Sequence, residues 1–524
     1  MRYIIKEYED IKKKVDNMSV DELLRCVICP DFPPEKKTPV TNTVSLMLHP
    51  TTRDVAVKAI DEVNAKRDER VLVTVDMEYG AGKALKGATR FPSMRAAAES
   101  GDEALAYEMG VVAAKEAIAA GYTWTFGPCV DILANHRNPI VSIRTSGEDA
   151  DTVLRYGGAY MRGLQDTGLI ATLKHFPGDG YSDNDQHITT TENPLSREEW
   201  DASFGKIYKT LIDEGVKAIM PGHISLPSYD ELDKETGLYP PATLSKALMT
   251  DLLRGKLGFE GIIVSDAINM TGFCGYMNVY RACARFLESG GDCLLFFHEN
   301  EESFSEMRSL IDSGELKVET LRNRAYRMLC FAREYFEEAD KTGKSDMGEA
   351  DVKMANECVR TMTQKCVKVI RDRAEMLPLN SNTNTRIAHI VLSNVGTPPG
   401  ALSAPDELTQ KLKEHFTKVD EHRDPGPGKA KEIAKSGEYD LIICSISNEM
   451  SWGLNTVKLS GAMARNMMNG WMRYGTPVVF VSYYDPYFHE DFEAAADTVI
   501  NTYGYSYYTN DAVLEKIFGE VKLS

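Results

Sequence analysis

Short apolar runs alternate with amphipathic segments along the first two-thirds of the chain, and this alternation limits the folds open to it. Eight runs have the length and flanking residues of buried strands: 24–29, 45–48, 71–75, 123–130, 169–173, 218–220, 262–264 and 293–297. Helical periodicity falls between them, at 52–67, 103–120, 149–167, 196–214 and 245–257. Strands that alternate with helices favour a parallel sheet, and eight of them suit a closed barrel. We therefore predict an α/β fold with a TIM-type (β/α)8 barrel, irregular at the proline-rich connection 30–42.

A polar stretch separates this region from the rest of the chain. A length of 524 residues exceeds one ordinary domain. The segment EEADKTGKSDMGEADVK has no aromatic residue and is typical of an exposed linker. Beyond it, apolar runs at 387–392, 441–446, 478–483 and 498–502 again alternate with helical segments. We predict a barrel domain over 1–338, a linker over 339–352 and a second α/β domain over 353–524.

Composition and cysteine usage exclude several classes of function. With 60 basic and 78 acidic residues the net charge is −18, which disfavours a nucleic-acid partner. No signal-peptide pattern and no apolar run long enough for a membrane span is present, so we expect a soluble cytoplasmic protein. The ten cysteines lack the regular spacing of a disulfide scaffold or a zinc site. Cys26 and Cys29 lie in a strand-like run that turns them to opposite faces, which favours core packing over metal chelation. The predicted function implies neither a metal nor an organic cofactor.

The segment KHFPGDGYSDNDQH, residues 174–187, has an unusual density of chemically active side chains. Lys174 and His175 follow the predicted strand 169–173, at the edge where α/β folds place their chemistry. Asp185 and His187 are two residues apart, so in an extended segment the carboxylate holds one imidazole nitrogen and leaves the other free to move protons. The alternative is an ordinary loop Asp and His without a catalytic role. A second stretch, GFEGIIVSDAINMTG, puts Asp266 at the end of another strand.

These two stretches resemble glycoside hydrolase family 3. The similarity continues through VDMEYG, FGPCVDI, NPIVSIRTSGEDA, IMPGHI and PATLSKALMTDLLRGKLGFEGIIVSDAINM, in the order in which that family has them. The Asp-x-His pair resembles the family's β-N-acetylglucosaminidase branch. The resemblance implies a (β/α)8 barrel followed by an α/β sandwich domain.

The resemblance also implies the catalytic roles. Asp266 is expected to be the nucleophile of a retaining mechanism, with helix capping as its structural alternative. His187 is expected to be the acid/base, and Asp185 to orient it and stabilise its charged form. This departs from the usual pair of carboxylates, but an imidazole can donate and accept protons near neutral pH.

Four residues are expected to bind the sugar: Asp76 as acceptor, and Arg144, Lys174 and His175 as donors. Their alternative is an internal salt-bridge network among the same charges. His223 either lines the pocket or packs below it, and Asp131 is expected to be structural support. No residue is assigned to a metal.

Two departures from the family pattern leave substrate detail open. DMEYGAGK stands where further glycine and a basic residue are usual, and Asp179 in PGDG stands where the family usually has His. The expected function is a retaining exo-β-N-acetylglucosaminidase, a β-N-acetylhexosaminidase that hydrolyses terminal N-acetylglucosamine from small glycans such as cell-wall or chitin fragments. The alternatives are a β-N-acetylglucosamine phosphorylase with inorganic phosphate as acceptor, a β-glucosidase of the same family, and a sugar-binding protein without catalysis.

Overall fold

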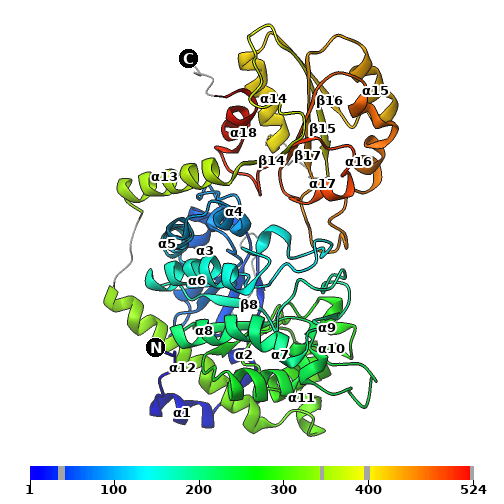
Figure 1. Ribbon diagram of the computed structural model, residues 1–524. Helices are drawn as coiled ribbons and strands as arrows, with labels where there is room; N and C mark the ends of the chain where they lie inside the picture. Colours follow the sequence, from blue (N-terminus) through cyan, green and yellow to red (C-terminus); the bar gives the residue numbers. More distant parts are fainter. Residues whose placement is uncertain (34–41, 343–346, 395–401, 520–524) are drawn as a thin grey trace. The chain divides into compact units, whose positions relative to one another are not determined.

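The computed structural model describes residues 1–33, 42–342, 347–394 and 402–519 (Figure 1). They form two units, one made of Met1–Thr89 and Glu103–Asn356, the other of Arg90–Asp102 and Glu357–Ser524. The boundaries predicted at 338 and 353 stay a prediction. The predicted irregular connection 30–42 falls largely outside the described residues.

The first unit contains a closed ring of parallel strands. Its members are β1 (Ile28–Cys29), β2 (Asp31–Phe32), β3 (Ser45–Leu48), β5 (Leu72–Val75), β7 (Trp124–Thr125), β8 (Thr172–Phe176), β10 (Ala218–Pro221), β12 (Ile262–Ile263) and β13 (Leu294–Leu295). Hydrogen-bonded pairs join β2–β3–β5–β7, β8–β10–β12 and β13–β1, while parallel bridges at Trp124–Ile170, Cys129–Lys174 and Val264–Cys293 link these groups. Strands β1 and β2 lie directly before and after Pro30 and together count as one strand of the barrel. The described ring therefore has eight strand positions. The predicted barrel is confirmed.

Helices surround this ring. They are α1 (Glu9–Asp16), α2 (Val20–Cys26), α3 (Arg53–Asn64), α5 (Glu103–Ala119), α6 (Ala150–Asp166), α7 (Arg197–Trp200), α8 (Lys206–Glu214), α9 (Thr271–Cys274), α10 (Val279–Glu288), α11 (Glu301–Asp312) and α12 (Val318–Thr342). Asp201–Gly205 and Ala247–Lys256 are π-helical. The short strands β4 (Thr51–Thr52), β6 (Leu85–Lys86), β9 (Thr191–Glu192) and β11 (Ile224–Ser225) pair outside the ring.

Helices α5 and α6 approach each other closely because both carry glycine at the crossing. A Cβ on Gly110 would collide with the carbonyl oxygen of Tyr160, and one on Gly163 with that of Tyr107. The helices therefore pack backbone to backbone at this point.

Several strand predictions were wrong in their limits: β7 is shorter than the predicted 123–130 and β13 is shorter than the predicted 293–297, and two further differences have a visible cause or consequence. Residues 24–26 end helix α2, because Ser19 and Glu22 form a capping box that starts a helix there. The strand predicted at 169–173 is β8 (Thr172–Phe176), so Lys174 and His175 lie within it. Lys174 can be buried in a strand because carboxylates neutralise it, as described below.

The second unit is built on one six-stranded sheet. Its order is β14–β19–β18–β17–β15–β16, with β14 antiparallel to β19 and the other pairs parallel. The strands are β14 (Lys368–Asp372), β15 (Arg386–Ser393), β16 (Lys418–Arg423), β17 (Leu441–Ser447), β18 (Val478–Ser482) and β19 (Thr498–Asn501). The helices are α13 (Glu349–Cys366), which begins before the unit, α14 (Ala404–His415), α15 (Gly426–Lys435), α16 (Gly461–Asn466), α17 (Phe488–Asp491) and α18 (Thr509–Phe518). The predicted α/β sandwich is confirmed.

A short excursion of the chain also belongs to this second unit. Residues Arg90–Asp102 carry α4 (Met94–Glu99). Ser93 donates to the carbonyl of Tyr503 at 2.5 Å, Lys368 pairs with Glu99 at 2.7 Å, and a Cβ on Gly504 would collide with the carbonyl oxygen of Pro92.

All ten cysteines are free thiols, nine of them buried and Cys274 partly exposed. Across the described residues, every helix is too short or too polar to cross a membrane.

Candidate active site

A charged network lies at the mouth of the barrel. Lys174 Nζ on β8 lies 2.9 Å from Asp76 Oδ1 and 2.8 Å from Glu78 Oε1. Arg144 binds both oxygens of Glu78, with Nε to Oε2 at 2.8 Å and Nη2 to Oε1 at 2.6 Å. Burial acts to raise the pKa of Glu78, but Arg144 and Lys174 outweigh it and hold that pKa well below its usual range. The internal salt bridges weighed from the sequence therefore exist, while Asp76 keeps half of its side chain exposed (50%) toward solvent.

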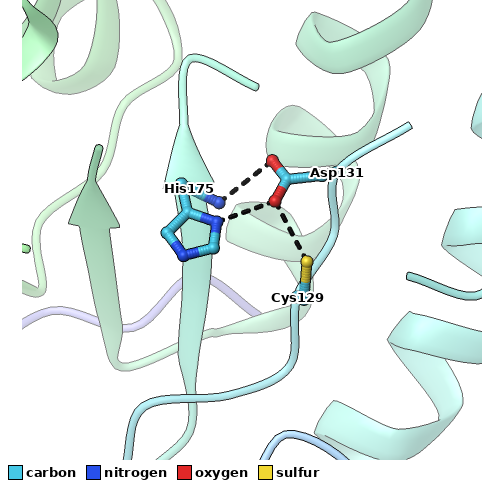
Figure 2. A group of neighbouring side chains, drawn as sticks. All are labelled: Cys129, Asp131 and His175. Carbon is cyan, nitrogen blue, oxygen red and sulfur yellow. Dashed lines mark hydrogen bonds and ion pairs between the residues drawn. The ribbon is translucent and has the colours of Figure 1, made fainter. Parts of the chain in front are cut away.

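His175 is hydrogen-bonded to the fully buried carboxylate of Asp131 (Figure 2). Its Nδ1 lies 2.7 Å from Asp131 Oδ2 and its backbone N–H donates to Oδ1 at 3.2 Å. The Cys129 thiol donates to the same Oδ2 at 3.0 Å. Because Nδ1 faces a carboxylate it carries a proton, and Nε2 is directed toward Arg144 Nη2 at 3.4 Å and Asp266 Oδ2 at 4.0 Å.

Cys129, Asp131 and His175 are also a set of residue types that bind metals. Tetrahedral ligands on bonds of about 2.0–2.3 Å must stand roughly 3.3 Å or more apart. Here Asp131 Oδ2 lies 2.7 Å from His175 Nδ1 and 3.0 Å from Cys129 Sγ, which are hydrogen-bond distances. The trio is a hydrogen-bonded support for His175, and we assign no metal to it.

Asp266 follows β12 and is almost fully buried, with 13% of its side chain exposed. Its Oδ1 accepts from the backbone N–H of Ala267 at 2.8 Å. Burial acts to raise the pKa of Asp266, but its electrostatic interactions with the imidazoles of His175 and His223 and with other neighbouring groups outweigh burial and bring that pKa below its usual value. The carboxylate is therefore ionised at neutral pH, as a nucleophile must be.

Asp185 and His187 form the predicted pair. His187 Nδ1 lies 2.7 Å from Asp185 Oδ1, and the backbone N–H of His187 donates to the same oxygen at 2.9 Å. The expectation of an extended backbone was wrong, because Ile188 N–H returns to the Asp185 carbonyl at 2.9 Å and closes a turn. Asp185 is buried while His187 keeps 26% of its side chain exposed, so the imidazole faces outward with one nitrogen fixed. Thr271 N–H donates to the His187 carbonyl at 2.9 Å and ties this loop to the segment that follows Asp266.

His223 is fully buried and both of its ring nitrogens are hydrogen-bonded within the protein. Its Nε2 lies 3.0 Å from the carbonyl of Ala267, an acceptor, so Nε2 is the donor and Nδ1 accepts from Thr243 at 3.0 Å. Burial lowers the pKa of His223, which keeps it neutral. Nε2 thus positions the backbone next to Asp266, while the bond from Thr243 fixes the orientation of the ring.

Asp179, which stands where the family usually has His, is buried beside Asp131. Its Oδ1 accepts from Gly180 N–H at 2.6 Å and from Asn138 at 2.9 Å, while Oδ2 has no hydrogen-bond partner among the described residues. Burial, with Asp131 adding to it, raises the pKa of Asp179 to about 6.

Sequence reasoning missed one residue of the site, Glu78, and the partner of another, Asp131. Glu78 connects Arg144 and Lys174. It lies two residues after Asp76, and this spacing could have indicated that both carboxylates bind the same cation, Lys174. Asp131 was expected to be support, but nothing in the sequence identified His175, 44 positions later, as its partner.

A parallel eight-stranded barrel with an ionised buried carboxylate and a carboxylate-held imidazole at its mouth defines a (β/α)8-barrel glycoside hydrolase. The chain belongs to glycosyl hydrolase family 3, because the family's N-terminal domain model matches residues 40–331. The predicted family is confirmed.

The chain is also similar to individual proteins whose names state an activity. A "Beta-N-acetylglucosaminidase/beta-glucosidase" of Cellulomonas fimi is 30% identical over 91% of this chain and 86% of that protein. A "Beta-hexosaminidase" of Chromobacterium violaceum is 31% identical over 48% of this chain and 69% of its own. The solved structure of a β-glucoside phosphorylase bound to 2FGlc superposes with a TM-score of 0.88 at 25% identity, covering 99% of this chain and 96% of that one.

Proposed function

We propose that the protein is a retaining exo-β-N-acetylglucosaminidase that releases terminal N-acetylglucosamine from small glycans in the cytoplasm. The observation that carries the proposal is the Asp185–His187 pair, 2.7 Å apart, on a loop tied to the segment after Asp266. The names of the Cellulomonas and Chromobacterium relatives support the N-acetylglucosamine part, and ten free thiols support a reducing compartment.

In the proposed reaction, Asp266 Oδ2 attacks the anomeric carbon while His187 gives its proton to the leaving oxygen. Asp185 stabilises the imidazolium before transfer and fixes which nitrogen acts. In the second half, His187 removes a proton from water, which attacks the anomeric carbon and breaks the ester to Asp266. Asp76, with its exposed edge, accepts hydrogen bonds from the sugar hydroxyls, and Lys174 and Arg144 hold the carboxylates in place.

A second candidate is transfer of the sugar to phosphate. The similarity to a β-glucoside phosphorylase over nearly the whole chain favours it, and a neutral imidazole repels an incoming phosphate less than a carboxylate base would. Against it, Lys174 and Arg144 are both already paired with carboxylates and so offer no unpaired charge to a phosphate dianion. We therefore favour hydrolysis.

The deciding experiment compares products in two buffers. Nitrophenyl N-acetylglucosaminide and nitrophenyl glucoside are each turned over in phosphate and in a non-phosphate buffer of equal pH and ionic strength. Free N-acetylglucosamine in both buffers supports the proposal. N-acetylglucosamine 1-phosphate as the main product would replace it with the phosphorylase, a preference for the glucoside would make the enzyme a β-glucosidase, and sugar binding without turnover would make it a binding protein.

A further inference from the structure

A cavity of about 390 Å³ opens beside the loop that carries His187. Its walls include Ile188 and Thr189, which directly follow His187, and Thr271, whose N–H holds the His187 carbonyl. None of the residues assigned to the terminal sugar lines it. The cavity therefore borders the loop that carries the proposed proton donor, and its lining is separate from the residues assigned to the terminal sugar.

Apolar and ring surfaces form much of its wall. Leu232, Leu238, Tyr239 and Tyr276 all line it. The Tyr276 hydroxyl donates to the carbonyl of Leu238 at 3.1 Å, which fixes the ring in place. Rings and aliphatic side chains of this kind pack against the C–H faces of a pyranose, and the volume lies within the range of small-molecule sites, about 300–1,000 Å³.

Among the residues that line the cavity, Glu192 alone is charged. It lies on β9, its side chain is exposed, and its carboxylate makes no hydrogen bond or ion pair with another described residue. Two arginines near the loop that supplies Leu232 and Leu238 are engaged elsewhere, Arg285 by Asp233 at 2.5 Å and Arg281 by Glu235 at 2.7 Å. The loop's own cation, Lys234, is exposed and lies outside the cavity lining. A ligand in the cavity therefore meets one negative charge in the cavity wall.

We infer that this cavity holds the leaving part of the substrate, an inference that rests on the glycosidase function proposed above. We infer further that Glu192 selects a neutral, hydroxyl-bearing sugar over a sugar that bears a carboxylate. Sugar hydroxyls donate to Glu192, whereas an anionic substituent is repelled by it. Of the two glycan types expected as substrates, the inference therefore favours chitin-type disaccharides over acid-bearing cell-wall disaccharides.

The test uses two disaccharides of equal size that differ in one charge. Both have N-acetylglucosamine β-linked to N-acetylmuramic acid, one with its lactyl carboxylate free and the other with that carboxylate amidated. The wild-type enzyme should show a higher kcat/KM for the amide, by about three- to tenfold. Glu192→Gln should remove this preference by improving turnover of the acid.

A matched control is Glu198→Gln, an exposed carboxylate on α7 that lies outside the cavity lining and should leave the preference intact. A second measurement needs no variant: raising the salt concentration should shrink the wild-type preference, because mobile ions screen exposed charges. A preference that Glu192→Gln and salt both leave unchanged, or no preference between acid and amide, would overturn the inference while the glycosidase function stands. An enzyme that cleaves neither disaccharide nor the nitrophenyl substrate would overturn the glycosidase function and the inference with it.

Discussion

At the scale of single residues, the site separates two kinds of carboxylate. Asp266 is kept ionised by neighbouring imidazoles, while Asp179 is pushed toward its protonated form by burial and by Asp131. An ionised Asp266 suits covalent chemistry, whereas the raised pKa of Asp179 makes the stability of the fold depend on pH.

Replacing Asp266 by Asn should remove nearly all turnover, by roughly 10³- to 10⁶-fold, because the amide cannot form the glycosyl ester. Its fold should be unchanged, since Asn is isosteric and its Oδ1 still accepts from Ala267. A mechanism-based fluorosugar should label Asp266 in the wild type. Peptide mapping that locates the label on another carboxylate would contradict the assignment.

His187→Ala should affect substrates according to their leaving group. A disaccharide needs protonation of the leaving oxygen and should lose about 10²- to 10⁴-fold, whereas a nitrophenyl substrate should lose far less in its first chemical step. Asp185→Ala should cost less than loss of the nucleophile, because the proton carrier remains. Equal losses on both substrates would show that His187 is not the acid.

Ionisation of the buried Asp179 side chain should lower the free energy of unfolding as the pH rises. Because its pKa is raised to about 6 in the folded state, its contribution is most favourable below about pH 4 and is lost as the pH rises through about 6. Asp179→Asn cannot ionise, so relative to wild type it should gain about 1–3 kcal/mol in free energy of unfolding between pH 4 and pH 7.5. Urea unfolding at both pH values measures this, with the exposed Asp183→Asn as control. A constant difference between Asp179→Asn and wild type would refute it.

At the scale of secondary-structure elements, the crossing of α5 and α6 depends on glycine. Gly163→Ala should destabilise the protein by about 1–3 kcal/mol, because the added methyl collides with the carbonyl oxygen of Tyr107. Gly157→Ala on the same helix is the matched control: its Cβ would lie 3.4 Å from Val130 Cγ1, an ordinary contact, and alanine favours the helix. In thermal unfolding, Gly163→Ala should have a lower midpoint than Gly157→Ala. Similar midpoints would show that α5 and α6 do not approach closely enough to require glycine at position 163.

The elements also show what the sequence could predict. Local patterns sufficed for β3 and for the contact between Asp185 and His187, because a short apolar run and a two-residue spacing are properties of adjacent residues. The start of α2 was missed although its capping box is local, because the apolar run 24–29 suggested a strand. Partners such as Asp131 and His175 could not be predicted without the fold, since their contact depends on neighbouring strands of the barrel.

At the scale of the whole molecule, the second unit includes residues from the middle of the barrel sequence. A fragment of residues 1–356 would retain Arg90–Asp102 but lose the Tyr503 carbonyl and Lys368, which bind Ser93 and Glu99. We expect trypsin to cut this segment in the fragment at Arg90 or Arg95 and to spare it in the full chain. Equal cleavage rates in the two would show that the segment is stable without those bonds.

The same excursion bears on how such proteins can be recombined. The chain passes between its units three times, after Thr89, Asp102 and Asn356, where a simple end-to-end fusion would pass once. A chimera that exchanges the C-terminal part with that of a relative must therefore exchange residues 90–102 as well, or it will pair α4 with a foreign surface. The unit that can be exchanged is discontinuous in sequence, so a single cut at the linker does not separate it from the barrel.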